Sequence, residues 1–158
     1  MTEQPKPIAI TSVIWEKCVE KKWAIKIRGR EVASWTLNGC VRLTEDGGTI
    51  YVELQIEGER VRFALTDTCF PLRYTIFTLE GCFSNIVFEN NRPKSFDVVI
   101  NACIDVSIDL GFPIGRVGIK ECVELYKQKI SLFFGQTVNT LSYEDEIIGT
   151  VAYFEGNP

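Results

Sequence analysis

Apolar and polar residues alternate along most of this chain, and the longest regular stretch covers residues 98–110. Every even position there is apolar, from Val98 to Leu110, whereas the odd positions are mostly polar. Successive side chains of a strand point to opposite faces, so this period of two predicts one long strand with one buried face. At about 3.3 Å per residue it would span roughly 43 Å, and such a strand must bend or carry a bulge in a small domain.

Shorter alternating segments predict a hairpin immediately upstream. Residues 49–56 and 60–65 alternate cleanly on either side of Glu57-Gly58, which is a turn signal. Their outward positions place Arg60 and Arg62 across from Glu53 and Gln55, a cross-strand pairing that stabilises a sheet modestly. This is the most regular hairpin pattern in the chain.

Other turns and strands follow from the same reading. Hairpins are predicted around residues 28–30 and around Glu80-Gly81, and Asn38-Gly39 is a further turn signal. Residues 8–15 predict a first strand, residues 16–22 a short turn of helix or a charged connection, and residues 146–154 a closing strand. Several hairpins in succession are typical of an antiparallel meander.

Residues 118–134 change period. Apolar residues recur there at spacings of three and four, acids lie early and lysines late, and Gly135 follows as a C-cap, so the segment predicts an amphipathic helix. A strand hairpinned to residues 98–110 through residues 111–115 is the alternative, because Val117, Ile119, Val123 and Leu125 favour strands and no N-cap residue is present. The fold class is therefore mainly β: an antiparallel meander closed into a barrel, or a two-sheet sandwich, with one helix near residues 118–134.

Length and composition agree with one β-rich domain over residues 1–158. The chain is 46% hydrophobic and 11% aromatic, which suits a substantial core. Residues 1–7 and 155–158 are expected to be flexible ends. No apolar run reaches the roughly 18 residues of a membrane-spanning helix, and residues 1–10 do not show a secretory-signal pattern. We expect a cytoplasmic location.

The reactive side chains exclude many function classes. Histidine is absent, which removes Ser–His and Cys–His nucleophile pairs and histidine-ligated metals. The six cysteines include no pair closer than 13 residues, so no zinc-ribbon or CxxC motif occurs. They could form three disulfides in any of fifteen pairings. Because no signal peptide is recognised, reduced thiols buried as small apolar groups are the favoured interpretation.

Charge and acidic residues give no clear active site. The net charge of −4 disfavours a general nucleic-acid binder, because phosphate neutralisation supplies most non-specific affinity. Residues 17–30 are basic and residues 97–158 acidic, so two copies could meet through them. Asp105 and Asp109 share one strand face, but their Cα atoms would lie about 13 Å apart, too far for a glycosidase pair. No glycine-rich phosphate loop occurs.

Two functional hypotheses remain. The first is a non-catalytic β-rich module for binding or self-assembly, without cofactor, metal, nucleic-acid or membrane partner. The second is a small barrel with an apolar cavity that binds a hydrophobic small molecule; an enzyme of this kind would be a cofactor-free cyclase or isomerase that holds a reactive conformer. The residues expected to line that cavity are Trp23, Trp35, Phe63 and Phe77. No catalytic residue is assigned.

Overall fold

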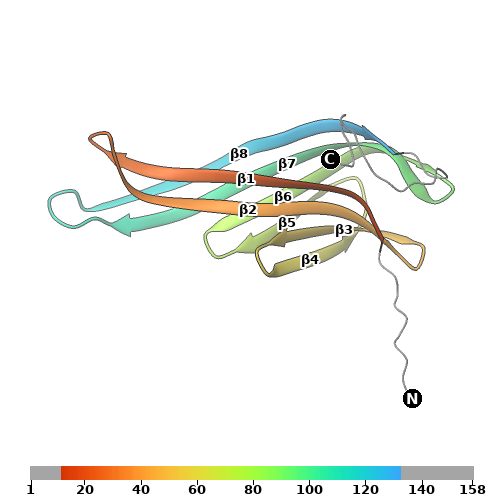
Figure 1. Cartoon of the computed structure of the whole chain (residues 1–158), viewed down its shortest axis with the longest axis horizontal. Helices are drawn as coiled ribbons and strands as arrows, with labels where there is room; N and C mark the ends of the chain where they lie inside the picture. Colours follow the sequence, from red (N-terminus) through yellow and green to blue (C-terminus); the bar gives the residue numbers. More distant parts are fainter. Residues whose placement is uncertain (1–11, 133–158) are drawn as a thin grey trace, which may run out of the picture.

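The computed structural model describes residues 12–132, which form two four-stranded antiparallel sheets packed face to face (Figure 1). The first sheet contains β1 (Ser12–Ile27), β2 (Arg30–Asp46), β3 (Thr49–Ile56) and β4 (Glu59–Ala64). The second contains β5 (Cys69–Tyr74), β6 (Phe77–Glu89), β7 (Arg92–Asp109) and β8 (Arg116–Ser131). Each sheet is a meander in chain order. Within the described residues the sheets share no strand pair, so the β fold is confirmed as a sandwich and not as a closed barrel.

The core lies between the sheets and uses the inward positions that the alternation predicts. On β7, Val98, Ile100 and Ala102 are fully buried, and the strand continues beyond the core toward Asp109. Trp15 of β1 packs across the sandwich against Phe83 of β6 and Phe96 of β7, with ring centroids 6.2 and 5.7 Å apart. The hydrophobic effect acts most strongly on such large apolar groups, so these aromatic rings hold the two sheets together.

The helix predicted over residues 118–134 is wrong for the part that the structure describes, because residues 116–131 form β8. The β7–β8 register shifts where Ile100 pairs with Tyr126 and Asn101 with Glu124, which leaves Leu125 as an extra residue. Before this bulge the odd positions face inward, and after it the even positions do. The change of phase spaces the inward residues by four, three and four, which imitates a helix. These residues are Ile119, Val123, Tyr126 and Ile130.

Two predicted turns are also wrong, at Asn38-Gly39 and Glu80-Gly81. Gly39 lies inside β2 and Gly81 inside β6, each paired with residues of both neighbouring strands. A Cβ added at Gly39 would lie 2.8 Å from Leu79 Cδ2, and one added at Gly81 would lie 3.1 Å from Val41 Cγ1. Leu79 and Val41 each belong to the sheet opposite the glycine, so both glycines leave room for a side chain of the other sheet.

Gly39→Ala is therefore expected to lower the free energy of unfolding by about 1–3 kcal/mol, the usual cost of overpacking a core. The added methyl group would also lie 3.2 Å from the carbonyl oxygen of Gln55, and backbone cannot move aside as a side chain can. Chemical denaturation measures the change. The control is Gly58→Ala, because a Cβ there meets nothing within 4 Å and its stability should stay the same. Equal stability of the Gly39→Ala variant and the original protein would contradict the close approach.

The edge strands β1 and β8 lie on the same side of the sandwich and contact one another. Residues 16–22, predicted as a short turn of helix or a connection, are part of β1, and Lys17 and Lys21 occupy inward positions of that strand. Lys17 Nζ lies 4.9 Å from the ring centroid of Tyr126 on β8. Trp23 Nε1 donates a 2.8 Å hydrogen bond to Glu121 on β8. These polar contacts link β1 to β8 at the edge of the sandwich, where the space between the two sheets meets solvent.

Some sequence predictions lie outside the described residues: the closing strand at 146–154, the flexible ends at 1–7 and 155–158, and the beginning of the first strand. The hairpin of β3 and β4 is confirmed, including the pairing of Arg62 with Glu53 and of Arg60 with Gln55. No helix in the described part of the chain is long and apolar enough to cross a membrane.

Candidate functional site

The cysteines form three disulfides, which corrects the expectation of reduced, buried thiols. Cys18 is bonded to Cys40, Cys69 to Cys82 and Cys103 to Cys122, and none of the six is free. The two residues of each bond stand directly opposite one another on adjacent strands. Strand register therefore brings each pair of sulfur atoms together. All six residues lie on outward, partly or fully exposed positions and not in the core.

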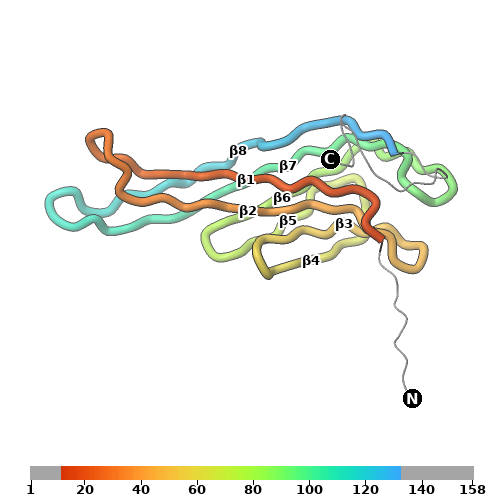
Figure 2. The backbone as a smooth tube through the Cα atoms, viewed as in Figure 1, coloured from red at the N-terminus to blue at the C-terminus, as the bar shows by residue number. Residues whose placement is uncertain are grey.

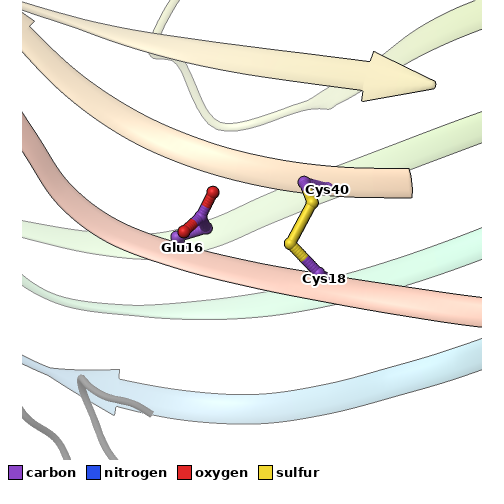
Figure 3. A group of neighbouring side chains, drawn as sticks. All are labelled: Glu16, Cys18 and Cys40. Carbon is purple, nitrogen blue, oxygen red and sulfur yellow. A yellow bond between two sulfur atoms is a disulfide. The ribbon is translucent and has the colours of Figure 1, made fainter. Parts of the chain in front are cut away.

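One disulfide borders a polar surface on the outer face of the first sheet. Figure 3 shows Cys18 on β1 joined to Cys40 on β2, with Glu16 two residues before Cys18 on the same face. A row of alternating charge crosses all four strands beside it, and we call this surface the arginine face. It comprises Glu16, Arg42, Thr44, Glu53, Arg60 and Arg62.

Ion pairs connect the row from strand to strand. Arg42 Nε donates to Glu16 Oε2 at 2.5 Å, and Arg42 Nη1 lies 3.8 Å from Glu53 Oε1. Arg60 Nη1 donates to Glu53 Oε2 at 3.3 Å. The Arg42 and Glu53 side chains are only 15% and 12% exposed, so the central pair is largely removed from water and its interaction is screened less than that of a surface pair.

Arg62 extends the row in a different way. Its guanidinium lies 3.9 Å from the ring centroid of Tyr51, and Nη2 donates to Asp46 Oδ2 at 3.3 Å. A guanidinium that stacks on an aromatic ring keeps its donors directed outward in its own plane, parallel to the ring. All three arginines of the face are thus held by side chains on other strands of the first sheet.

Two depressions lie on this side of the sheet, and Arg42 lines both. The larger, of about 430 Å³, is lined by Arg42, Thr44, Glu53, Arg60 and Arg62 together with Val13. The smaller, of about 280 Å³, is lined by the Cys18–Cys40 disulfide and by Val19, Asn38, Gly39, Arg42, Gln55 and Glu57. Both are open to solvent on the surface of the sheet.

Three buried polar atoms along these depressions make no hydrogen bond within the described residues. They are Arg42 Nη1, Thr44 Oγ1 and Gln55 Oε1. Thr44 is only 1% exposed, although it points away from the core. A buried polar group without a hydrogen bond typically costs about 1–3 kcal/mol, so each such atom calls for a water, an ion or a ligand as partner; of the three, Arg42 Nη1 already has Glu53 Oε1 at 3.8 Å. All the described atoms of this kind line the two depressions, which identifies the arginine face as the candidate site.

The disulfides determine whether two groups of candidate ligands can bind a metal ion. Glu16 lies with Cys18 and Cys40 in one group of candidate metal ligands, and Glu80 lies with Cys69 and Cys82 in another. Only a thiolate ligates a metal strongly, and the sulfur atoms of each group are bonded to one another. Neither group is therefore a metal site while its disulfide is intact.

Of the four aromatic residues predicted to line a cavity, the structure brings Trp23, Trp35 and Phe77 together and places Phe63 apart from them. Trp23 stacks on Phe77 across the sandwich, with ring centroids 6.1 Å apart, and Trp35 stands opposite Trp23 on β2. Phe63 packs on Phe70 at 5.2 Å, on the side of β4 and β5. Neither depression described above is lined by any of the four. Their role in ligand binding stays a prediction.

The sequence did not single out the arginine face, apart from the pairing of Arg60 and Arg62 with β3. Arg42 and Thr44 belong to a strand whose predicted turn at Asn38-Gly39 obscured its outward positions. Opposite charges at equivalent outward positions of β2 and β3 were the available signal. The chain matches no protein-family model, no curated protein and no solved structure. Its function is accordingly inferred from the chemistry of this face.

Proposed function

We propose that the protein is a non-catalytic binding module whose arginine face holds an acidic saccharide. The observation that supports this most directly is the alignment of Arg42 Nη1, Thr44 Oγ1 and Gln55 Oε1 along one face, all buried and without a hydrogen bond among the described residues. A saccharide offers hydroxyl groups that both donate and accept hydrogen bonds. Among the three atoms, Arg42 Nη1 donates, Gln55 Oε1 accepts and the Thr44 hydroxyl can do both.

The guanidinium groups of the lining can pair with an acidic group of a ligand, although their charges are balanced within the protein. The larger depression contains three guanidinium groups and one carboxylate, and Glu16 and Asp46 at its border bring the number of carboxylates to three. A guanidinium binds a carboxylate or sulfate through paired hydrogen bonds. A polyanion such as nucleic acid would meet the compensating carboxylates, so one acidic group among hydroxyls fits better.

The three disulfides support an oxidising compartment as the place where the protein acts. Disulfides persist outside the reducing cytosol and are rare within it. This proposal replaces the expectation of a cytoplasmic location. An acidic saccharide is a ligand that such a compartment commonly presents, for example at cell surfaces.

Thr44→Val is expected to weaken saccharide binding about tenfold while leaving the free energy of unfolding unchanged or higher, because it replaces a buried, unpartnered hydroxyl with a methyl group of similar shape. Calorimetric titration with an oligogalacturonate, an acidic saccharide, measures the affinity, and denaturation measures the stability. Thr78→Val on β6 of the second sheet is the matched control. A purely structural role for Thr44 would instead lower stability and leave affinity unchanged.

Arg60→Gln tests the charge. The Arg60 side chain is 58% exposed and lines the larger depression, so it can be neutralised without opening the core. The affinity for oligogalacturonate should fall about tenfold, the effect of losing one charge-assisted hydrogen bond. The affinity for a neutral oligosaccharide of the same length should not change. Absence of binding by the original protein, or equal losses for both saccharides, would contradict the proposal.

A further inference from the structure

The two longest hairpins end on the same side of the molecule. The β1–β2 and β7–β8 hairpins run past the ends of the shorter strands, and both turns lie at the left in Figure 1 and Figure 2. The first turn is at Arg28 and Gly29, and the second covers residues 110–115. We call these two turns together the hairpin end. It is separate from the depressions of the arginine face, whose lining on β1 and β2 is limited to residues 13–19 and 38–44.

The β7–β8 turn presents apolar side chains to solvent. Phe112 is 100% exposed and Ile114 is 47% exposed. The backbone around them is nevertheless fixed, because Leu110 N donates to Gly115 O at 2.8 Å and Gly115 N donates to Gly111 O at 2.6 Å. Asp109 Oδ1 also accepts a 2.8 Å hydrogen bond from Gly111 N. An ordered loop therefore displays a phenyl ring that the rest of the described chain does not cover.

The β1–β2 turn presents unpaired positive charge. Lys26, Arg28 and Arg30 lie at this turn, and within residues 12–132 none of the three makes an ion pair. The nearby Glu31 is already engaged by Lys22 at 3.2 Å, and the hydrogen bond from Lys22 followed by its charge holds the pKa of Glu31 below its usual value. Lys26 stands opposite Glu31 on β1 and its charge also acts on that carboxylate, so Arg28 and Arg30 are the cations of this turn without such a partner among residues 12–132.

We propose that the hairpin end docks on a bilayer surface that contains anionic lipids. An aromatic side chain on a convex loop can enter the boundary between headgroups and acyl chains, and lysine and arginine near the surface are attracted to anionic headgroups. The two turns are separate and the apolar one protrudes. A deformable partner that extends sideways therefore fits both turns better than a rigid partner with one pocket. This surface replaces the earlier expectation of no membrane partner, and it does not depend on the saccharide site.

The test is sedimentation of the full chain, with its disulfides intact, with two kinds of vesicle. One kind is phosphatidylcholine alone, and the other contains about one quarter phosphatidylglycerol, enough to give a negative surface potential. The original protein should bind the anionic vesicles and lose most of that binding in about 0.5 M salt, which shortens the range of electrostatic attraction.

Two variants separate the apolar from the charged contribution. Phe112→Ala and the double variant Arg28→Gln/Arg30→Gln should each bind the anionic vesicles about tenfold more weakly. Phe88→Ala, which removes another exposed ring, and Lys94→Gln/Lys129→Gln, which removes two other charges, are the matched controls and should bind normally. Thr44→Val should also bind normally, which separates this surface from the arginine face.

Three results would overturn the proposal. They are absence of binding to both vesicles, equal binding to neutral and anionic vesicles, and hairpin-end variants that behave like their controls. Sedimentation velocity adds one more: a self-associated species that disappears in Phe112→Ala, without vesicle binding, would assign the hairpin end to contact between copies.

Discussion

Reduction of the three disulfides is expected to remove about 9 kcal/mol from the free energy of unfolding, or about 3 kcal/mol for each bond. The bonds close loops with sequence separations of 22, 13 and 19 residues. These loops do not overlap, so the conformational entropy that each removes from the unfolded chain should add to the others. Domains are typically stable by about 5–15 kcal/mol, so the reduced chain should be at the limit of folding.

Unfolding by denaturant with and without reductant measures this loss, and circular dichroism at zero denaturant shows whether the reduced chain folds at all. Thiol titration of the unreduced, denatured protein should find no free cysteine. Replacing both members of one pair, for instance Cys103→Val with Cys122→Val, should cost about a third of the total. Unchanged stability on reduction, or six titratable thiols in the untreated protein, would show that the chain does not rely on these bonds.

Phe83→Ala is expected to cost about 3–5 kcal/mol, the usual range for truncating a buried phenylalanine. Phe83 is 1% exposed, and its ring lies 6.2 Å from that of Trp15 on the first sheet. It also contacts Phe70 and Phe96 within the second sheet, at 6.3 and 5.6 Å. One ring thus contacts three others from both sheets, and its removal leaves a cavity that rigid neighbouring strands cannot fill.

Denaturation under non-reducing conditions measures the effect of Phe83→Ala. The control is Phe88→Ala on the same strand, where the side chain is 52% exposed and the change should stay within about 0.5 kcal/mol. Phe83→Leu should fall between the two, because it keeps part of the buried volume. Similar losses for Phe83→Ala and Phe88→Ala would mean that Phe83 does not organise the core.

The strands with uninterrupted alternation could be predicted from sequence, and those with a bulge could not. β3, β4 and the inner face of β7 follow the period of two; the bounds of β3 and β4 were predicted to within one residue, whereas β7 begins at Arg92, six residues before the predicted strand. In β8 the extra residue Leu125 shifts the phase. Periodicity alone cannot distinguish one bulge in a strand from a turn of helix, because both give spacings of three and four.

The turns predicted at Gly39 and Gly81 were wrong for a related reason. Asn38-Gly39 and Glu80-Gly81 have the composition of turns, yet both glycines are required where a side chain from the opposite sheet leaves no room. The true turn between β5 and β6 has Thr75 at a φ of 55°, a backbone conformation that a threonine in the sequence does not predict. Close packing between sheets is a long-range property that a local pattern does not contain.

Part of the disulfide pairing could be inferred from the positions of the cysteines in the sequence. Cys18 and Cys40 are centred on the turn at residue 29, and Cys103 and Cys122 on the turn at residues 112 and 113. Cysteines placed symmetrically about a hairpin turn face one another across the strands. The first turn was predicted, but the helix assigned to residues 118–134 hid the second pair. The arginine face required the order of four strands, which sequence did not supply.

The inward charges of Lys17 and Lys21 on β1 and of Glu121 on β8 have a consequence for how copies of this protein can meet. An exposed strand of 16 residues is a template for growth of a continuous intermolecular sheet, which is the route to fibrils. A chain that extended the sheet at β1 or β8 would bring its own apolar face against these charges and would have to strip them of water. The longest edges of the molecule therefore resist fibrillation, and the faces and hairpin ends remain as its surfaces for specific contact.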